Sequence, residues 1–182
     1  MQSDILFLQE RYMSLCMQNE YFTNFNCISS RIKHGLMILI KKHITILEHI
    51  HFEEHLVEAL LEKIIVHGSQ IAILNIYASP HENLNNILNV IAKALCHLDL
   101  KDIIIILGDF NIGMLQCNQK TELESYMNNY NLHFLINKTN SVHKSFIDHV
   151  WSNVTNIQYR IFILDTKLIA CINHSLTMCG QM

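Results

Sequence analysis

An aspartate and an asparagine that follow directly on an apolar run are the first residues that could do chemistry. Gly108-Asp109-Phe110-Asn111 ends the run Ile103 to Leu107. A continuous run of β-branched and apolar residues is typical of a strand buried on both faces. Asp109 offers an anionic acceptor, and Asn111 offers a neutral donor and acceptor. This pair suits metal-assisted phosphoryl chemistry, in which one group handles a proton and the other orients a phosphate oxygen.

Four more polar motifs stand at the ends of apolar runs, where the edge of a sheet can form a site. In chain order, the five motifs are Leu8-Gln9-Glu10, Asn75-Ile76-Tyr77-Ala78-Ser79-Pro80, Gly108-Asp109-Phe110-Asn111, Ser145-Phe146-Ile147-Asp148-His149 and Asn173-His174-Ser175. Taken singly, each residue has an ordinary structural interpretation. Glu10 is then a solvated carboxylate, Tyr77 a sheet residue with a wet hydroxyl, and Asp148 and His174 a structural hydrogen-bonded pair.

The elements that position these motifs are mostly predicted strands. Leu60 to Val66 and Ile71 to Tyr77 flank a short Gly-bearing connection, which predicts a β-hairpin. The segment Ile44 to Glu58 is ambiguous between loop and helix. Apolar runs predict further strands at residues 4–9, 35–40, 103–107, 134–136, 145–151, 159–164 and 168–172.

Two helices are predicted between the strands. Ser79-Pro80-His81-Glu82 has the pattern of a helix start, with Ser79 as the N-cap, and apolar residues follow at helical spacing. Thr121-Glu122-Leu123-Glu124 predicts a second helix that ends at about Tyr130. Strand-rich segments with hairpin connections predict one α/β domain over residues 1–182, and its sheets should be mixed.

The composition narrows the class of protein. Of the 182 residues, 50% are hydrophobic and 16% are charged, which is enough for a core and too little charge for disorder. A protein that binds DNA through many lysine–phosphate contacts is usually basic, whereas this chain has a formal charge of −3. Affinity for nucleic acid would therefore need a metal or a separate domain. Six cysteines without a CxxC pair indicate reduced thiols and an intracellular protein.

No signal peptide is recognised, and no apolar run approaches the length of about 20 residues that spans a bilayer. We therefore expect an intracellular protein that does not enter a membrane, with a nuclear location left open. His51-Phe52-Glu53-Glu54-His55 matches the H-x-x-E-H pattern of some zinc peptidases. With twelve histidines in the chain and no third ligand placed, a solvated acidic segment is the better interpretation.

The five ordered motifs resemble the endonuclease/exonuclease/phosphatase superfamily, the relatives of DNase I and of the abasic-site endonucleases, over nearly the whole chain. Ile147 to Asn153, together with Asn75 to Pro80, is similar to endonuclease domains carried by retrotransposons and by helicase-fused mobile elements. The resemblance implies an α/β fold, a DNase I-like sandwich of two mixed β-sheets flanked by helices. It also implies that the first strand is lacking and that the domain is incomplete at both ends.

The resemblance also implies a role for each site residue. Glu10 would bind a divalent cation, Mg²⁺ or Mn²⁺. Asp109 would deprotonate the attacking water and contribute to the metal site, and Asn111 would hold that water or the scissile phosphate. Tyr77 would donate a hydrogen bond to the phosphate, as would His174, whose tautomer Asp148 would fix. The substrate would be nucleic acid, with DNA favoured over RNA, and the parent element would carry a reverse transcriptase or a helicase.

Two departures from the family pattern oppose activity. Family members carry Asp before the final His, in the metal or charge network, and this chain has Asn173, whose amide lacks the negative charge. The family also has an earlier strand that ends in Asn, and its absence predicts an unpaired edge beside the strand at residues 4–9. The alternative hypothesis is therefore a catalytically impaired or dead remnant of a mobile-element endonuclease that at most binds nucleic acid.

Overall fold

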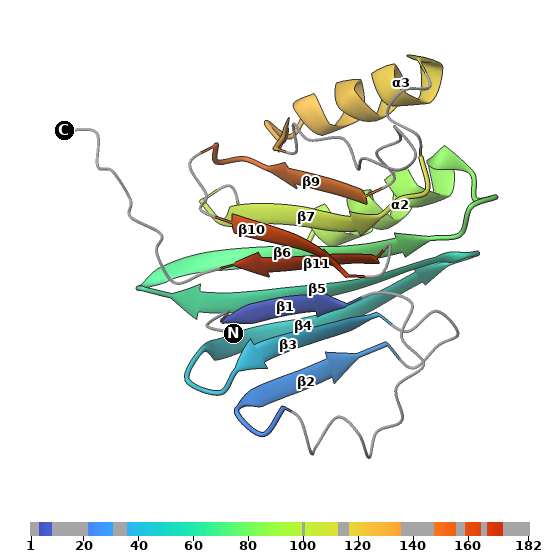
Figure 1. Ribbon diagram of the computed structural model, residues 1–182. Helices are drawn as coiled ribbons and strands as arrows, with labels where there is room; N and C mark the ends of the chain where they lie inside the picture. Colours follow the sequence, from blue (N-terminus) through green and yellow to red (C-terminus); the bar gives the residue numbers. More distant parts are fainter. Residues whose placement is uncertain are drawn as a thin grey trace.

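Two stacked β-sheets and two helices make up the computed structural model, which describes residues 4–8, 22–30, 36–99, 101–112, 117–135, 148–155, 159–164 and 167–172 (Figure 1). The larger sheet contains, in spatial order, β4 (Thr45–Glu54), β5 (Val57–Val66), β6 (Ser69–Ala78), β7 (Ile103–Asp109), β9 (Asp148–Ser152) and β8 (His133–Phe134). The smaller sheet contains β10 (Tyr159–Leu164), β11 (Lys167–Ile172), β1 (Ile5–Leu8), β3 (Met37–Lys41) and β2 (Phe25–Ser29). The helices are α2 (Leu84–Leu95) and α3 (Cys117–Asn128). The predicted α/β sandwich is confirmed.

The larger sheet is mixed, as predicted. The β5–β6 hairpin is confirmed, with its turn at His67 and Gly68, where both residues have positive φ. The β6 strand pairs in parallel with β7, and α2 makes the crossover between them; the other pairs in this sheet are antiparallel. A parallel pair requires such a crossover, so the C-terminal ends of β6 and β7 lie next to each other at one end of the sheet.

The smaller sheet differs from the prediction in two ways. Its described strand pairs are all antiparallel, so this sheet is not mixed. The strand β1 was expected to have an unpaired edge, but it lies between β3 and β11, with Ile5 opposite both Ile40 and Ile172. Its backbone groups are therefore paired on both sides, and the expected edge is absent from this strand.

Side-chain alternation builds a core on each face of the larger sheet. Residues such as Leu60 and Ile105 pack with Phe7 and Ile38 of the smaller sheet. Their sequence neighbours, such as Leu61 and Ile106, pack on the opposite face with α2 and α3. The buried residues of α2 recur at helical spacing, and they are Leu84, Ile87, Leu88, Val90, Ile91 and Ala94. The long apolar runs of β6 and β7 follow from this burial on both faces.

The structure differs from the predicted elements at four places, one of which is the start of α3 at Cys117 rather than at Thr121. The ambiguous segment at residues 44–58 contains β4, a regular ten-residue strand. His51 therefore lies in a strand and His55 in a turn with φ of 54°, so the helix that a zinc pair would need does not form. The helix α2 begins after Asn83, whose side chain accepts a hydrogen bond from Asn85 N–H, rather than at Ser79. The strand β2 was not predicted at all.

Among the described residues, neither helix is long and apolar enough to cross a bilayer.

A glutamate is fully buried in the middle of β5. Glu62 is 0% exposed; its Oε1 contacts Nδ1 of His49, its register partner in β4, and its Oε2 has no hydrogen-bond partner among the described residues. Burial raises the pKa of Glu62 to about 8. Burial, and then the charge of His51, lowers the pKa of His49. At neutral pH the pair therefore keeps its proton on the buried carboxyl group.

This buried carboxyl group makes the free energy of unfolding depend on pH. The folded state holds the proton more tightly than an unfolded chain with an ordinary glutamate pKa, so stability is full in mild acid and falls as pH rises towards about 8. Glu62→Gln removes the titrating group. Between pH 6 and pH 9, urea unfolding should show a loss in the parent chain that exceeds that of the variant by roughly 1–3 kcal/mol. Glu53→Gln, at an exposed position in β4, is the control; parallel losses in the Glu62→Gln variant and the parent would contradict this assignment.

Candidate active site

Three of the predicted site residues occupy one level of three neighbouring strands. Tyr77 in β6 is the register partner of Asp109 in β7, and Asp109 is the partner of Asp148 in β9. Register partners lie on the same face of a sheet. For Tyr77, which is 4% exposed, this is the face that packs against the smaller sheet. For Asp148, the register of the backbone alone places the residue in this row. The row therefore brings a hydroxyl and a carboxylate to one end of the sandwich.

The loop that follows β7 is fixed by two hydrogen bonds of Asn111, one from its backbone and one from its side chain. Its backbone N–H donates to Oδ1 of Asp109 (2.9 Å), and its Nδ2 donates to the carbonyl oxygen of Ala78 at the end of β6 (2.7 Å). Asn111 has a φ of 48°, a left-handed conformation that asparagine tolerates better than most residues. Gly108 has a φ of 144°, which a side chain would rarely allow. The Gly-Asp-Phe-Asn sequence thus suits this turn.

A histidine that was quoted only as part of a motif proves to hold this loop. His149 is completely buried in β9, and its ring stacks on Phe110, with 4.7 Å between the ring centroids and 9° between the planes. Its Nε2 lies 3.1 Å from the carbonyl oxygen of Ile112. The sequence did contain a signal for this role, namely a histidine within a predicted strand. A polar ring is seldom buried without a hydrogen-bond partner, so this histidine could have been expected to hold another group.

A glutamate that was not predicted extends the row on its other side. Glu58 in β5 is the register partner of Tyr77 and is 3% exposed. Its Oε2 accepts a hydrogen bond from Oγ of Ser30 (3.0 Å), and this Oγ accepts one from the N–H of Leu36 (3.2 Å). Ser30 follows β2 directly, so the contact joins the two sheets at the end where Tyr77 and Asp109 lie. The predicted hairpin could have identified Glu58, because aligning its two strands in register places Glu58 opposite Tyr77.

Two of the described residues carry donor atoms of the type that a divalent metal ion binds. Asp109 and Asn111 offer oxygen atoms, the donor type that Mg²⁺ and Mn²⁺ prefer, and Asp109 is only half-buried. No three His, Cys, Asp or Glu residues of the described ranges gather closely enough to hold an ion. Glu10, Asn173 and His174 lie outside the described residues, as does the side chain of Asp148. The donor set of Asp109 and Asn111 thus fits a hard cation.

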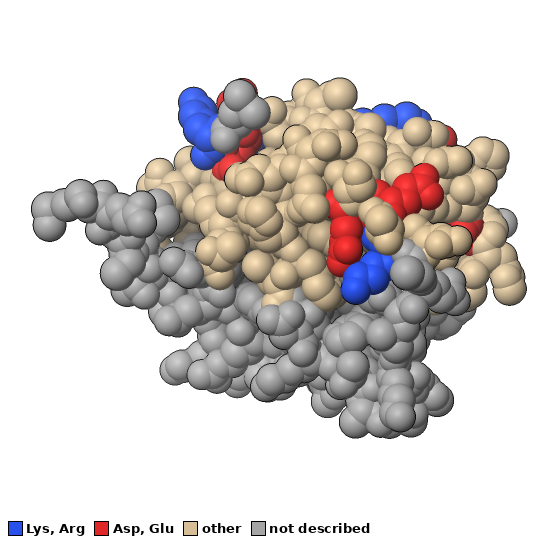
Figure 2. All heavy atoms as spheres, turned by 90° about the horizontal axis from the view of Figure 1, so that it is seen from above, with Lys and Arg blue, Asp and Glu red and all other residues tan. Residues whose placement is uncertain are grey.

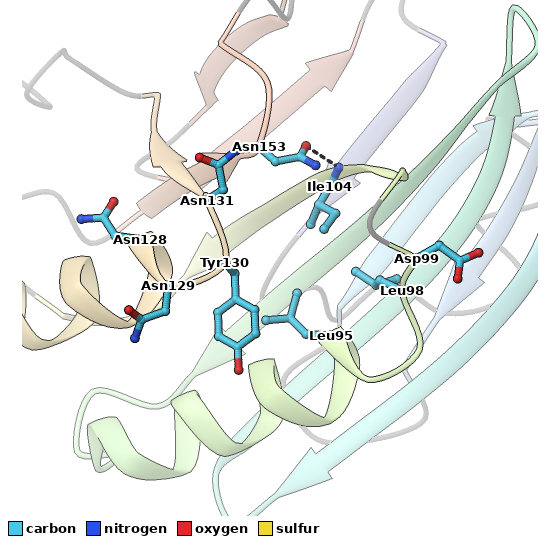
Figure 3. Close-up of a pocket in the computed structure, with 9 residues that line it drawn as sticks. All are labelled: Leu95, Leu98, Asp99, Ile104, Asn128, Asn129, Tyr130, Asn131 and Asn153. Carbon is cyan, nitrogen blue, oxygen red and sulfur yellow. Dashed lines mark hydrogen bonds between the residues drawn. The ribbon is translucent and has the colours of Figure 1, made fainter.

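A cavity of about 410 Å³ lies away from this row (Figure 3). It is lined by the C-terminal end of α2, by the Asn-rich turn around Tyr130, by Asn153 and by Ile104, which is near the start of β7. Asp109 is at the opposite end of the same strand. The lining contains no Lys, Arg or His, so it offers no cation to a phosphate. The candidate active site is therefore the row at the end of β7.

The surface charge agrees with the modest net charge of the chain. On the face seen in Figure 2, basic and acidic side chains are scattered among uncharged residues, and no continuous basic stripe crosses the described part of that face. Several lysines are also paired with carboxylates, as in Lys41–Asp4 (2.7 Å) and Lys93–Glu54 (2.6 Å). Phosphate attraction by lysines alone is therefore weak on this face.

Comparison with known proteins gives a family and a set of similar folds. Residues 71–175 match the family model described as "Endonuclease-reverse transcriptase". The endonuclease domain of TRAS1, a telomere-specific non-LTR retrotransposon, has 15% identity over 93% of this chain and 85% of its own, with a TM-score of 0.67. TDP2 of D. rerio, complexed with a single-strand DNA product, has 13% identity over 92% and 84%, with a TM-score of 0.66.

An endonuclease/exonuclease/phosphatase family protein from Bacteroides thetaiotaomicron has 12% identity over 93% of this chain and 82% of its own, with a TM-score of 0.66. At these identities the solved structures support the fold alone. No curated protein sequence matches the chain. The family match includes the motifs of Tyr77, Asp109, Asp148 and His174, so it spans the row seen in the structure.

Proposed function

Because the chain belongs to the endonuclease-reverse transcriptase family, within the DNase I-like endonuclease/exonuclease/phosphatase superfamily, we propose that it is an endonuclease that cleaves phosphodiester bonds in nucleic acid. The superfamily consists of metal-dependent phosphodiesterases and nucleases. The observation that carries the proposal is the row of Tyr77, Asp109 and Asp148 at one level of β6, β7 and β9, with Asn111 fixed beside it.

Each residue of the row has a defined task in hydrolysis. Asp109 takes a proton from water, whose oxygen attacks phosphorus in line with the leaving oxygen. The bond from phosphorus to the leaving oxygen breaks, and that oxygen takes up a proton from solvent. Tyr77 donates its hydroxyl hydrogen to a phosphate oxygen, and Asn111 orients the water or the phosphate. His174 donates to the phosphate, with its tautomer fixed by Asp148. These assignments follow the family motifs, and the register of β6, β7 and β9 supports a common site for Tyr77, Asp109 and Asp148.

The cation is proposed to be Mg²⁺, with Mn²⁺ as a substitute. Glu10 and Asp109 would hold it through carboxylate oxygens, with a contribution at Asn173. When bound, the cation supplies positive charge that stabilises the charge developing on the phosphate oxygens. The charge on the face seen in Figure 2 supports this role, because the basic side chains visible there do not form a continuous stripe that could bind phosphates.

DNA is the proposed substrate. The solved structures with similar folds include a retrotransposon endonuclease and a protein complexed with a single-strand DNA product, and they support this choice. A reverse transcriptase or helicase in the parent element, and work in the nucleus, belong to the same proposal. Nicking of supercoiled plasmid by the purified chain tests it: nicking should require Mg²⁺ and stop with EDTA. Absence of nicking with Mg²⁺ and with Mn²⁺, by a chain shown to be folded, would reject the proposal.

The second candidate function is that of an impaired remnant, and Asn173 favours it, because the family carries Asp at this position. Asn173→Asp restores the negative charge beside His174. If this position is the main defect, the variant should nick plasmid roughly tenfold faster than the parent chain or more, in keeping with the weight of groups that support a metal or a histidine. Asn129→Asp, at an exposed position, adds the same charge elsewhere and should change nothing. Equal rates in all three chains would place the defect elsewhere.

A further inference from the structure

His149 touches the loop after β7 at two points, and neither contact is part of the proposed chemistry. We propose that His149 is a positioning residue that holds Phe110 to Ile112, and through them Asp109 and Asn111, in the conformation that hydrolysis needs. The inference rests on the proposed function for its activity measurements. The effect of His149 on the conformation of the loop can be tested separately, by a measurement that does not depend on activity.

The first contact is a hydrogen bond with a defined direction. Nε2 of His149 lies 3.1 Å from the carbonyl oxygen of Ile112. A carbonyl oxygen can only accept, so Nε2 carries the hydrogen, and the tautomer of the ring is fixed by this contact. Ile112 is 3% exposed, so water has little access to replace a lost donor. The bond therefore fixes the loop one residue beyond Asn111.

The second contact is a stack that fixes the middle of the loop. The rings of His149 and Phe110 are nearly parallel, with centroids 4.7 Å apart, and Phe110 is 1% exposed. Phe134 meets the edge of the same histidine ring at 5.8 Å, and Trp151 lies at 6.2 Å. The imidazole is therefore held by aromatic neighbours, and it transmits a fixed position to Phe110, between Asp109 and Asn111.

The histidine acts from the side of the sheet opposite to the chemistry. His149 stacks on Phe110 of the helix-side core, so its ring lies on the helix-covered face of the sheet. His149 packs among residues of the core beneath α3, whereas Tyr77 packs between the sheets. A phenylalanine would fill this apolar site at lower desolvation cost, and what histidine adds is the N–H that holds Ile112.

The test compares two substitutions in the same aromatic cluster. His149→Phe keeps a buried ring that can stack on Phe110 and removes the donor to Ile112. Trp151→Phe, the matched control, changes a ring of the same cluster and leaves the His149 donor to Ile112 in place. With Mg²⁺ and plasmid DNA, His149→Phe should lower kcat about tenfold or more and change KM less than twofold, because the nucleic-acid surface is intact. Trp151→Phe should keep the kcat of the parent chain. Unchanged kcat in His149→Phe, or an equal loss in Trp151→Phe, would overturn the inference.

A conservative variant and a second measurement complete the test. His149→Gln keeps an N–H donor near Ile112 and should recover part of the kcat lost in His149→Phe. Amide hydrogen exchange of the Asn111 N–H, which donates to Asp109 Oδ1, reports the loop without any catalysis. Exchange should be at least several-fold faster in His149→Phe than in the parent chain. If the parent chain fails to nick DNA, the proposed function fails; if Asn111 exchanges equally in both chains, the positioning role fails.

Discussion

Replacing Asp109 with Asn should lower the rate of Mg²⁺-dependent plasmid nicking a hundredfold or more. General-base catalysis contributes on the order of 10²–10⁴ to a rate, and this substitution also removes an oxygen anion from the metal site. The fold should tolerate the change. Asp109 is only half-buried, and the Oδ1 of an asparagine side chain can still accept the hydrogen bond from Asn111 N–H. Nicking rates at saturating Mg²⁺, with melting temperatures of both chains, measure the effect.

Asp99→Asn is the control for this substitution. Asp99 is exposed and lies at the cavity near the start of β7, at the opposite end of the strand from Asp109. The same change of charge at this position should leave the nicking rate within twofold of the parent chain. A rate in Asp109→Asn that is also within twofold would remove Asp109 from the mechanism and, with it, the proposed base.

Replacing Trp151 with Ala should reduce the free energy of unfolding by about 3–5 kcal/mol, the range for emptying a large buried aromatic site. Trp151 is 1% exposed and lies in the core between β9 and the helices, with the ring of Phe134 at 5.0 Å. Because whole domains are stable by only about 5–15 kcal/mol, a sizeable fraction of the variant should be unfolded in mild denaturant. Urea unfolding followed by circular dichroism measures the loss.

Trp151→Phe sharpens this prediction. The indole Nε1–H has no hydrogen-bond partner among the described residues, so phenylalanine keeps most of the apolar contact and gives up an unsatisfied polar group. This variant should lose less than half of the free energy that Trp151→Ala loses. An equal loss in both would mean that the indole N–H, and not the packing of the ring, stabilises β9.

Apolar periodicity predicted the elements that are buried on both sides. The runs of β6 and β7 are of this kind, and helical spacing of apolar residues also predicted the single buried face of α2. It failed for β4, which lies at the edge of its sheet and alternates charged residues with residues such as Ile50 and Phe52 on the helix side. An edge strand with Glu and His on its open side has no continuous apolar run, and its charges help to prevent edge-to-edge association.

The start of α2 was misplaced because a tertiary contact overrides the local pattern. The carboxylate of Glu82 accepts hydrogen bonds from the N–H of Asn83 (2.7 Å) and from the N–H of Leu56 in the β4–β5 turn (2.7 Å). Glu82 therefore ties two loops together instead of closing a capping box on Ser79. Asn83 caps the helix in its place. Such a contact between distant turns is invisible in a sequence window.

For the candidate site, the motifs supplied residue types, and the strand register supplied their proximity. Spacing in the chain does not reveal that Tyr77, Asp109 and Asp148 share one level, since a shift of one residue would turn a side chain to the other face. The roles of His149 and Glu58 were missed for the same reason. Both act through partners that are distant in sequence, Ile112 for His149 and Ser30 for Glu58.

The central position of β1 in the smaller sheet has a consequence for the order of folding. Ile5 pairs with Ile40 on one side and with Ile172 on the other, so one partner of β1 is synthesised soon after it and the other much later. Pairs that close so long a loop form slowly, and until then β1 exposes an open edge to other chains. A nascent chain that stalls before β11 therefore presents an open strand edge on which other chains can aggregate, and pairing with β11 removes this edge.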